Sequence, residues 1–376
     1  MIVTGTLLRK WGRRIQSMHM GIVWVTMGLC ALGLMMQFSA SGGDPMIFAV
    51  PQAMRLVLGV VLMLVLVMVP TTVLFRASYM IYFLCLGLLV MVAAVGVMGL
   101  GAQRWVGLGS LNLQPSELMK IGIILALAHY FHTVQINKTV SHLKLLIIPG
   151  IITLVPVGLI LKQPNLGTAT IVSFIAFAMC FMAGLRWWFF AGAIAAVASA
   201  APVAYHFLHD YQKQRVLTFL NPDSDPLGAG YNIIQSKIAI GSGGFFGKGL
   251  LNGSQGQLDF LPEKQTDFIF TMLAEELGFA GSVVLISLYA TLLIFAMRLA
   301  VRARNTFCRL LAAGVAAMLF IHVFINMAMV MGIIPVVGVP LPFLSYGGSF
   351  LLAALMACGL LQHAYVNRDV TLPRNF

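Results

Sequence analysis

Apolar runs of about twenty residues alternate with shorter polar segments along most of the chain. A helix needs ~20 apolar residues to cross the hydrocarbon of a bilayer, and each run comes close to that length. The expected spans lie at about 20–38, 53–69, 78–100, 117–133, 143–161, 167–184, 186–206, 267–297, 307–334 and 344–366. The pattern therefore predicts an all-α polytopic membrane protein with ten transmembrane helices in one domain over residues 1–376.

Composition agrees with this pattern. Hydrophobic residues make up 60% of the chain and charged residues 9%, whereas soluble domains carry about 25% charged residues. A soluble enzyme is therefore excluded. The net charge is +12, but no basic patch is interleaved with aromatic residues, so we expect no nucleic-acid partner. The five cysteines lie in or at the ends of apolar runs, where packing is their expected role.

The basic residues predict an orientation, because cytoplasmic loops of membrane proteins carry an excess of Lys and Arg. With the N-terminus in the cytoplasm, 14 of the 23 Lys and Arg fall on the inner side and seven of the 11 acids on the outer side. We therefore expect both termini in the cytoplasm and one large extracytoplasmic loop at about 207–266. Four basic residues precede the first run, as in a signal peptide, but the run is too long for one, so we expect an uncleaved span.

Acidic residues are concentrated in Leu258–Glu276, which joins the large polar segment to the eighth run. Pro262 disfavours helical geometry before it, so we expect the helix to begin near Thr266 or Asp267, either of which is an acceptable N-cap. Asp267 then stands where a wet loop meets a membrane span, a position from which a carboxylate can contact a polar head group. The alternative is that Asp267 only caps the helix. The segment holds five of the chain's 11 acids: Asp259, Glu263, Asp267, Glu275 and Glu276.

Two short stretches on the predicted outer side carry further candidate site residues. Gly101–Lys120 begins as a glycine-rich loop with Arg104 and Trp105, although tryptophan at such a place is also a common interface anchor. The turn Lys162–Thr168 carries Gln163 and has backbone amides that could bind sugar hydroxyls.

Two longer stretches rich in glycine or proline complete the set. Ala239–Gly253 contains Lys248, and the amides of its glycines at 241, 243, 244, 247 and 249 could form a nest for an anion; plain turns are the alternative. Gly332–Ser349 contains Ser345 and three prolines within apolar sequence. Such backbone at membrane depth must be covered by protein or line a water-filled cavity. A re-entrant loop that faces the outer site fits this segment, with a plain turn as the competing interpretation.

Ionisable residues within the spans are the remaining candidates. Glu117 and Lys120 are three residues apart in one predicted helix, a spacing that allows them to pair. Ionisable groups inside a span are functional candidates by default, but a pair near a helix start is more often structural. We therefore expect supporting roles for Glu117, Lys120 and Glu275. The sequence shows no metal-binding His and Cys spacing and no nucleophile elbow, so covalent hydrolase chemistry is not expected.

Taken together, these stretches resemble the SEDS family (shape, elongation, division and sporulation). The resemblance implies a ten-span glycosyltransferase of the bacterial cytoplasmic membrane, with its active site on the extracytoplasmic side, that polymerises lipid II into the glycan strands of peptidoglycan. It also implies a class B penicillin-binding protein and the elongation machinery as partners. The elongation branch is favoured over the division branch, which usually carries Lys where this chain has Val337. The matching phrases are GAQRWVGLG, QPSELMK, QPNLGTA, HDYQKQRV, NPDSDPLGAGYNIIQSKIAIGSGGFFGKG, FLPEKQTDFIF, AEELGFAG and GIIPVVGVPLPFLSYGGS.

The resemblance also implies roles for individual residues. Asp267 matches the family's essential acid and is the expected catalytic base; it could instead hold Mg²⁺ or Mn²⁺, and the sequence does not choose between the two. Asn165 stands where the family usually has an acid, which removes the charge that an ionic role at that turn would need. The candidate contacts to the substrate and its pyrophosphate leaving group are Arg104, Trp105, Gln163, Lys248, Asp259, Glu263 and Ser345.

Two other functions fit the same precursor chemistry. One is a flippase or transporter of lipid II, and the other is a scaffold for the penicillin-binding protein without activity of its own. A transporter lines its path with polar groups near the membrane midplane. Here most of the unusual residues fall on the predicted outer side, which favours the polymerase.

Overall fold

The computed structural model describes residues 11–95, 97–99, 102–108, 111–134, 142–207, 210–221, 228–258, 260–261 and 263–373. In this part of the chain, each of the ten predicted apolar runs overlaps one long helix. These helices are α2 (Met20–Ala40), α3 (Ala49–Met68), α4 (Thr71–Val95), α5 (Pro115–Thr133), α6 (His142–Lys162), α7 (Leu166–Met182), α8 (Trp187–Phe207), α12 (Ile269–Arg302), α13 (Thr306–Val330) and α14 (Gly348–Val366). Within the described residues, seven of them are long and apolar enough to cross a membrane. The chain is therefore a multi-pass membrane protein.

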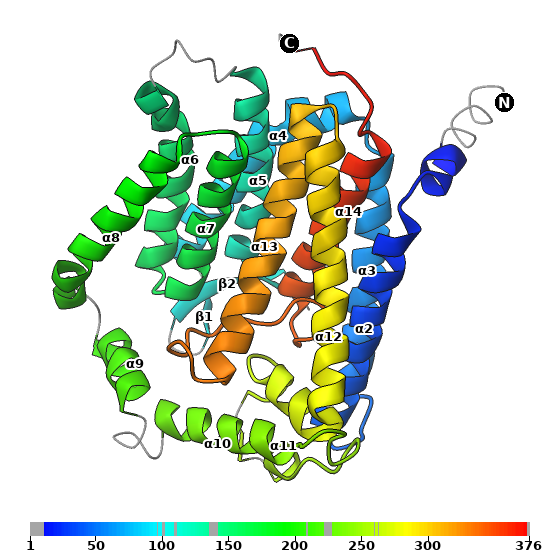
Figure 1. Cartoon of the computed structure of the whole chain (residues 1–376), viewed down its shortest axis with the longest axis vertical. Coiled ribbons are helices and arrows are strands. Elements are labelled where there is room, and N and C mark those ends of the chain that lie inside the picture. The colour runs from blue at the N-terminus through cyan, green and yellow to red at the C-terminus, as the bar shows by residue number, and fades with distance from the viewer. Residues whose placement is uncertain are drawn as a thin grey trace.

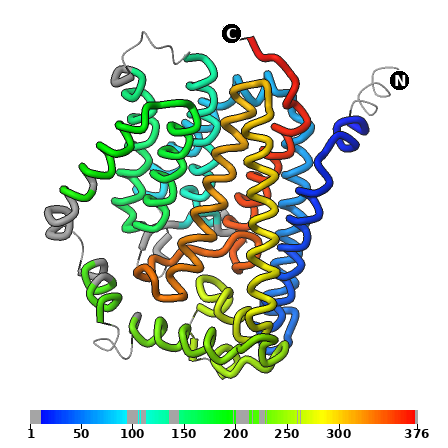
Figure 2. Tube along the Cα trace, viewed as in Figure 1, coloured from blue at the N-terminus to red at the C-terminus, as the bar shows by residue number. Residues whose placement is uncertain are grey.

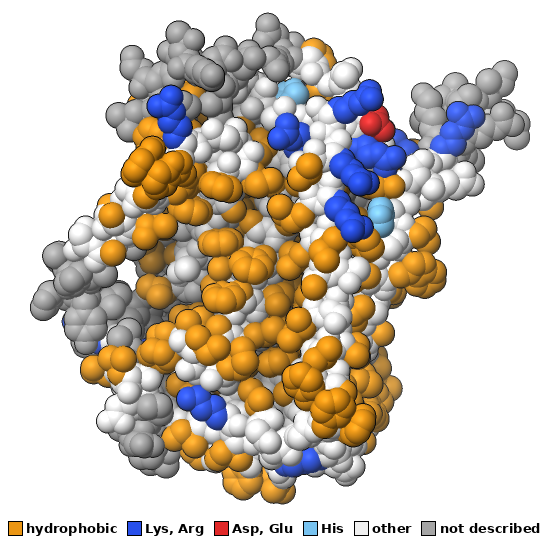
Figure 3. Space-filling model, in the orientation of Figure 1, with side chains coloured by type: hydrophobic (Ala, Val, Ile, Leu, Met, Phe, Trp, Pro, Cys, Tyr) orange, Lys and Arg blue, Asp and Glu red, His pale blue; other side chains and the backbone are white. Residues whose placement is uncertain are grey.

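The helices form one bundle whose two ends differ. Figure 1 shows that α2 begins and α14 ends at one end of the bundle, and that the short helices α10 (Ala229–Ser242) and α11 (Ser254–Gln257) lie across the other end. On the face shown in Figure 3, Lys and Arg gather at the end where the termini lie, and hydrophobic side chains cover the middle. This distribution is typical of a membrane protein whose apolar middle is surrounded by lipid.

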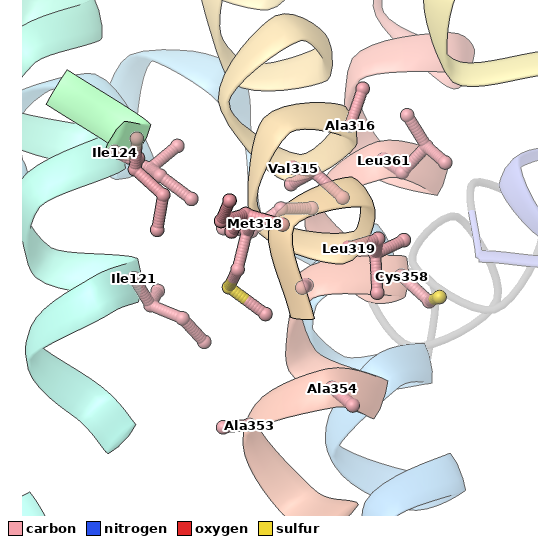
Figure 4. Packing of buried hydrophobic residues seen from close by; sticks show 14 of the residues in the cluster. Ile121, Ile124, Val315, Ala316, Met318, Leu319, Ala353, Ala354, Cys358 and Leu361 are labelled. Atoms are coloured by element: carbon pink, nitrogen blue, oxygen red, sulfur yellow. The ribbon is translucent and has the colours of Figure 1, made fainter. Parts of the chain in front are cut away.

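The centre of the bundle is built from α5, α13 and α14. Inside the structure, 83% of the apolar window of α13 and 78% of that of α14 are buried, against 22–39% for the other candidate spans. Figure 4 shows side chains of these three helices meeting, with Ile124 of α5, Val315 of α13 and Ala354 of α14 among them. Glycine permits this close approach: a Cβ on Gly314 of α13 would lie 2.9 Å from Cγ2 of Ile124, and small residues at interfaces let membrane helices pack tightly.

The prediction of an all-α chain is wrong in one place. The stretch between α4 and α5 forms an antiparallel sheet in the order β1 (Val97–Gly99), β2 (Ala102–Leu108), β3 (Leu111–Leu113). Glycines separate short runs that contain β-favouring residues, Trp105 and Val106 among them, and such sequence supports tight hairpins. The expected glycine-rich loop is therefore folded.

The predicted large loop at about 207–266 is also largely folded. In its described part it contains α9 (Asp210–Leu220), α10 and α11. The glycine-rich segment after α10 lies against α12, where the Lys248 amide donates to the Glu275 carbonyl oxygen and the Gly249 amide to the Glu276 carbonyl oxygen, both at 3.0 Å. The Gly247 amide donates to the Gly243 carbonyl oxygen at 2.9 Å. Three amides of this segment are therefore bonded to backbone, which favours the plain turns over an anion nest.

A break in α12 makes this contact possible. Gly278 has φ 66° and ψ −160°, which is not helical. The freed amides of Phe279 and Ala280 donate to the carbonyl oxygens of Gly244 and Phe245, each at 2.9 Å. A Cβ on Gly278 would collide with the amide nitrogen of Gly247, so this position requires glycine for both conformation and space. The overlong apolar run is therefore a kinked helix with a docked segment.

Between α13 and α14, residues 331–347 run without helix through the interior of the bundle (Figure 2). Val339, Leu341, Phe343 and Leu344 on this segment are all at most 2% exposed. Gly33 of α2 lies so close to the Phe343 carbonyl oxygen that a Cβ would collide with it. Protein therefore covers this irregular backbone, as the re-entrant interpretation required.

Candidate active site at the start of α12

Asp267 belongs to a closed turn, not to the helix that follows it. The α12 helix begins at Ile269, its N-cap is Phe268, and no side chain caps it. Glu263, in the left-handed region at φ 55°, accepts hydrogen bonds at its carbonyl oxygen from the amides of Thr266 and Phe268. The expected cap at Thr266 or Asp267 is therefore wrong, because the turn holds both residues out of helical geometry and leaves the carboxylate of Asp267 free of that role.

Three consecutive backbone carbonyls hold this turn against the rest of the bundle. The Gln265 oxygen accepts from Nε2 of Gln37 in α2 at 3.0 Å and from the amide of Tyr346 at 2.8 Å. The Thr266 oxygen accepts from Oγ of Ser345 at 2.6 Å. Ser345 is 1% exposed, so it positions the acid-bearing turn; it was expected to contact substrate.

Asn326 of α13 makes the third connection. Its Nδ2 donates to the Asp267 carbonyl oxygen at 2.9 Å and to the Val339 carbonyl oxygen at 2.7 Å. A buried amide thereby links the acid to both α13 and the interior segment. Because the backbone of Asp267 and of the two residues before it is fixed in this way, its carboxylate has a defined position.

The side chain of Asp267 lies in a gap that glycine keeps open. A Cβ on Gly338, where φ is +71°, would lie 3.3 Å from Oδ2 of Asp267. Among the described residues, no hydrogen bond to the Asp267 carboxylate is found, and the side chain is partly exposed. A carboxylate in this setting has free acceptor positions for a ligand.

Burial and a neighbouring charge raise the pKa of Asp267. Burial is the main cause, the Glu263 carboxylate adds to it, and the Arg215 guanidinium acts in the opposite direction, so that the pKa of Asp267 rises from 3.8 to about 6. A carboxyl whose pKa lies near the working pH is suited to accept and release a proton.

Arg215 is a site residue that the sequence did not single out. It lies in α9, and its Nη1 donates to the Val336 carbonyl oxygen at 3.1 Å, two residues before Gly338. It is the cation whose charge acts on Asp267. The phrase HDYQKQRV around it was visible as a polar stretch, but nothing local in it predicts that Arg215 meets the segment after α13.

Lys248 and Glu275 form a separate cluster farther along α12. Lys248 Nζ lies 2.7 Å from Oε1 of Glu275 and 2.9 Å from Oγ of Ser254, and the same carboxylate oxygen accepts from the Gln255 amide at 3.1 Å. Glu275 lies six residues inside α12, or ~9 Å along its axis, whereas Asp267 precedes the helix. The structure therefore does not bring Lys248 to Asp267, and the geometry of Glu275 agrees with a supporting role.

Glu117 and Lys120 pair as their spacing predicts. Lys120 Nζ lies 2.6 Å from Oε2 of Glu117 and 2.8 Å from Nε2 of His322 in α13. All three side chains are buried, at 4%, 1% and 1% exposure. His322 was missed because the eight histidines are scattered and only the fold brings this one to α5. The cluster joins α5 to α13, which agrees with structural support.

The turn between α6 and α7 has a structural explanation. Gln163 donates from Nε2 to the Leu89 carbonyl oxygen at 3.1 Å and is 6% exposed, so its amide ties α6 to α4. Asn165 caps α7 by accepting from the Thr168 amide at 3.2 Å. A cap needs an acceptor oxygen, which Asn and Asp both supply. Asn165 can thus take the place of an acid without loss of the turn.

The remaining predicted site residues are less fully described. Trp105 is partly exposed in β2, where it pairs with Val97. Arg104 is also in β2, but its side chain falls outside the described atoms, and Asp259 lies outside the described residues. Among the described residues no group of three His, Cys, Asp or Glu could hold a metal. The charge of Glu263 acts on Asp267, so these two carboxylates are near each other.

Known proteins resemble this chain over nearly its whole length. Residues 20–369 match the profile of the family described as cell cycle protein, FtsW/RodA/SpoVE. The peptidoglycan glycosyltransferase MrdB of Escherichia coli (strain K12) is 45% identical over 319 residues, which are 84% of this chain and 85% of that protein.

Solved structures give the same result. A chain from the structure described as "Structural coordination of polymerization and crosslinking by a peptidoglycan synthase complex" has a TM-score of 0.82 and 35% identity, covering 94% of this chain and 99% of that one. The rod shape determining protein RodA of Thermus thermophilus has a TM-score of 0.71 and 32% identity, with 93% and 97% covered. The matched range of 20–369 includes the acid-bearing turn.

Proposed function

The chain belongs to the FtsW/RodA/SpoVE family of cell cycle proteins, and we propose that it is a peptidoglycan glycosyltransferase that polymerises lipid II during cell elongation. The names of its relatives supply the reaction class. The observation that carries the site is Asp267, whose backbone is fixed by α2, α13 and the interior segment while its carboxylate has no hydrogen bond in the described part of the chain.

The reaction is a displacement at an anomeric carbon. The 4-hydroxyl oxygen of one lipid II forms a bond to C1 of the sugar at the end of another strand, and the bond from C1 to undecaprenyl pyrophosphate breaks on the opposite face, which inverts the configuration. The hydroxyl proton passes to the carboxylate of Asp267. A positioned base of this kind contributes typically ~10²–10⁴-fold.

Positive charge is needed where the pyrophosphate leaves. Arg215 lies close enough to act on the charge of Asp267, so it can neutralise part of the developing negative charge. Mg²⁺ is commonly held by one or two carboxylates together with substrate phosphates. In the alternative role, Asp267 would hold Mg²⁺ or Mn²⁺ instead of accepting the proton, with Glu263, whose charge acts on Asp267, as the second carboxylate. The ion would then supply further positive charge to the phosphates.

The proposed topology rests on the basic residues, 14 of which fall on the inner side of a ten-span scheme. In this scheme both termini are cytoplasmic, and the segment at about 207–266, with the Asp267 turn, is extracytoplasmic. Four native cysteines are buried and Cys180 is half-buried, while Phe246 is 80% exposed. A Phe246→Cys protein should react with an impermeant maleimide from outside the cell, and reaction from the cytoplasmic side alone would reverse the scheme.

A class B penicillin-binding protein is the proposed partner, because a new glycan strand must be crosslinked near the place where it is made. One structural relative comes from a peptidoglycan synthase complex that is described as coordinating polymerization and crosslinking. The contact would use lipid-facing apolar surface and part of the extracytoplasmic segment. Copurification in detergent tests the contact. A chain that purifies alone and polymerises at full rate would argue against dependence on the partner.

Polymerisation by the purified protein tests the function itself. Lipid II in vesicles should be converted to glycan strands, which gel separation resolves, and the rate of lipid II exchange between leaflets should equal that of empty vesicles. Exchange without strand formation would favour the flippase, and neither activity in the presence of the partner would favour the scaffold.

A further inference from the structure

Arg55 is a partly exposed cation of α3 for which the described residues provide no acid. It lies in α3 on the stripe that contains Gln52 and Gly59, the face that packs against α14. None of the ion pairs in the described part of the chain involves Arg55. Its Nη1 is buried and has no hydrogen-bond partner there. An unpaired charge at such a place is costly, and an ionisable residue within a span is a functional candidate by default.

Aromatic and backbone contacts hold the guanidinium in place. It stacks over the ring of Tyr346 at 4.6 Å from the centroid, and that ring lies 5.0 Å from the ring of Phe48. A Cβ on Gly348 would lie 3.3 Å from Nε of Arg55. Stacking on a ring uses the face of the guanidinium and leaves its N–H edge for an acceptor.

The N-terminus of α14 adds a second source of positive potential at the same place. Its N-cap is Gly347, no side chain caps it, and its first turn contains no acid. The positive end of a helix dipole attracts anions. Arg55 and the start of α14 therefore form a basic site that no ion pair among the described residues neutralises.

The surroundings indicate an anion that arrives from the membrane. Arg55 lies six residues inside α3, or ~9 Å along its axis. The neighbouring positions Met54, Val57 and Leu58 are 63%, 65% and 41% exposed, and side chains of this kind on a candidate span face lipid. The site also adjoins the acid-bearing turn, since the Tyr346 amide donates to the Gln265 carbonyl oxygen at 2.8 Å.

We propose that Arg55, together with the N-terminus of α14, binds the phosphate of a lipid headgroup, and that this lipid is an isoprenoid diphosphate. The choice of isoprenoid rests on the proposed function; the phosphate does not, because a phospholipid offers the same group. A guanidinium donates two parallel hydrogen bonds to phosphate oxygens. The site would hold a lipid-borne diphosphate near the turn that carries Asp267.

Native mass spectrometry of the purified full-length protein tests this proposal. The protein is titrated in one arm with undecaprenyl diphosphate and in the other with phosphatidylglycerol. Arg55→Gln, which removes the charge, should weaken binding by about tenfold to a hundredfold. Arg55→Lys keeps the charge without the planar fork and should fall between. Arg298→Gln, which removes an exposed arginine from the far end of α12, should bind as the parent does.

The two arms distinguish the sources of the phosphate. Weakening in the undecaprenyl diphosphate arm supports the proposal, and weakening confined to phosphatidylglycerol overturns the isoprenoid assignment. Unchanged binding in both arms by folded Arg55→Gln and Arg55→Lys proteins overturns the site itself. Because binding is measured without turnover, a protein that binds through Arg55 but makes no glycan would refute only the proposed function.

Discussion

Asp267 and Glu275 lie eight residues apart at the same end of the bundle, yet they are held in opposite ways. Glu275 is 1% exposed, and its carboxylate accepts from the Lys248 ammonium, the Ser254 hydroxyl and the Gln255 amide. Asp267 has its backbone oxygen fixed by Asn326, while no described group donates to its carboxylate. The charge of Glu275 is therefore neutralised by its partners. In Asp267 the backbone is held in place, but the charge is not neutralised by a hydrogen bond from a described group.

This difference in hydrogen bonding distinguishes a carboxylate that supports the fold from one that can take part in a reaction. A buried carboxylate that is paired with a cation and accepts several hydrogen bonds stabilises the fold and offers little to a substrate. A carboxylate that is fixed in place but unfilled costs stability and can accept a proton. Acid count alone, which drew attention to Leu258–Glu276, cannot tell these two apart.

The largest expected effect is on glycan synthesis by Asp267→Asn. The change keeps size and removes the charge, and the protein should fold normally because the described contacts of Asp267 are made by its backbone. Polymerisation of lipid II should fall by at least ~10²-fold. Near-normal synthesis by a well-folded Asp267→Asn protein would move the base elsewhere, with Glu263 and Asp259 the next carboxylates to test.

Glu275→Gln should do the reverse and lower stability more than activity. Removing one partner of a buried ion pair leaves the other uncompensated. Because the Lys248 side chain is 29% exposed, we expect a loss of only about 1–3 kcal/mol in unfolding free energy, read as a lower thermal midpoint. The double variant Lys248→Met/Glu275→Gln should recover part of that loss. Normal stability with lost polymerisation would place Glu275 in the active site.

The free carboxylate of Asp267 should make stability depend on pH. Its pKa is about 6 in the fold and 3.8 in the reference state, so the folded protein holds the proton more tightly than the unfolded chain. The free energy of unfolding should therefore fall as the pH rises from about 4 to about 6. Above that range the carboxylate is charged and the whole loss of stability is present. Since the side chain is partly exposed, we expect on the order of 1–2 kcal/mol.

Comparing the thermal stability of the parent with that of Asp267→Asn isolates the contribution of the Asp267 carboxylate. At about pH 8, roughly two units above the folded pKa of about 6, the carboxylate is charged and the variant should unfold at a higher temperature than the parent. The gap should close toward pH 4. A gap that stays constant over this range would mean that the carboxylate carries no such cost.

The smallest effect is expected at Asn165→Asp. Both residues accept from the Thr168 amide as an N-cap, so the unfolding free energy should change by less than ~0.5 kcal/mol and polymerisation should not change. The matched variant Asn165→Ala should cost about 1 kcal/mol. A gain in polymerisation with Asp would show that a charge at this turn acts on the reaction.

Sequence reasoning succeeded where structure depends on local pattern. Apolar runs of span length predicted where the long helices of the described residues lie, and the spacing of Glu117 and Lys120 predicted their pairing, because helical geometry brings residues three apart together. It failed where pairing is non-local: β1 and β3 are three residues each, and only contact with β2 makes them strands.

The site shows the same limit. The segment with Asp267 was visible as an accumulation of acids, but its connections join residues far apart in the chain. Gln37 lies 228 positions from Gln265, and Asn326 lies 59 from Asp267. The misplaced helix start has a similar cause, since Pro262 and the acids favoured a cap while the turn at Glu263 and its distant partners held Asp267 outside the helix.

The connections of the turn to α2, α13 and the interior segment make the acid sensitive to how the bundle is arranged. Hydrogen bonds of 2.6–3.0 Å weaken steeply when stretched, so a shift of about 1 Å between α12 and either neighbour would break one of them. A displacement of α2 or α13 relative to α12 would therefore move the Asp267 carboxylate without any contact with it. The position of this acid is tied to the spacing of the helices around it.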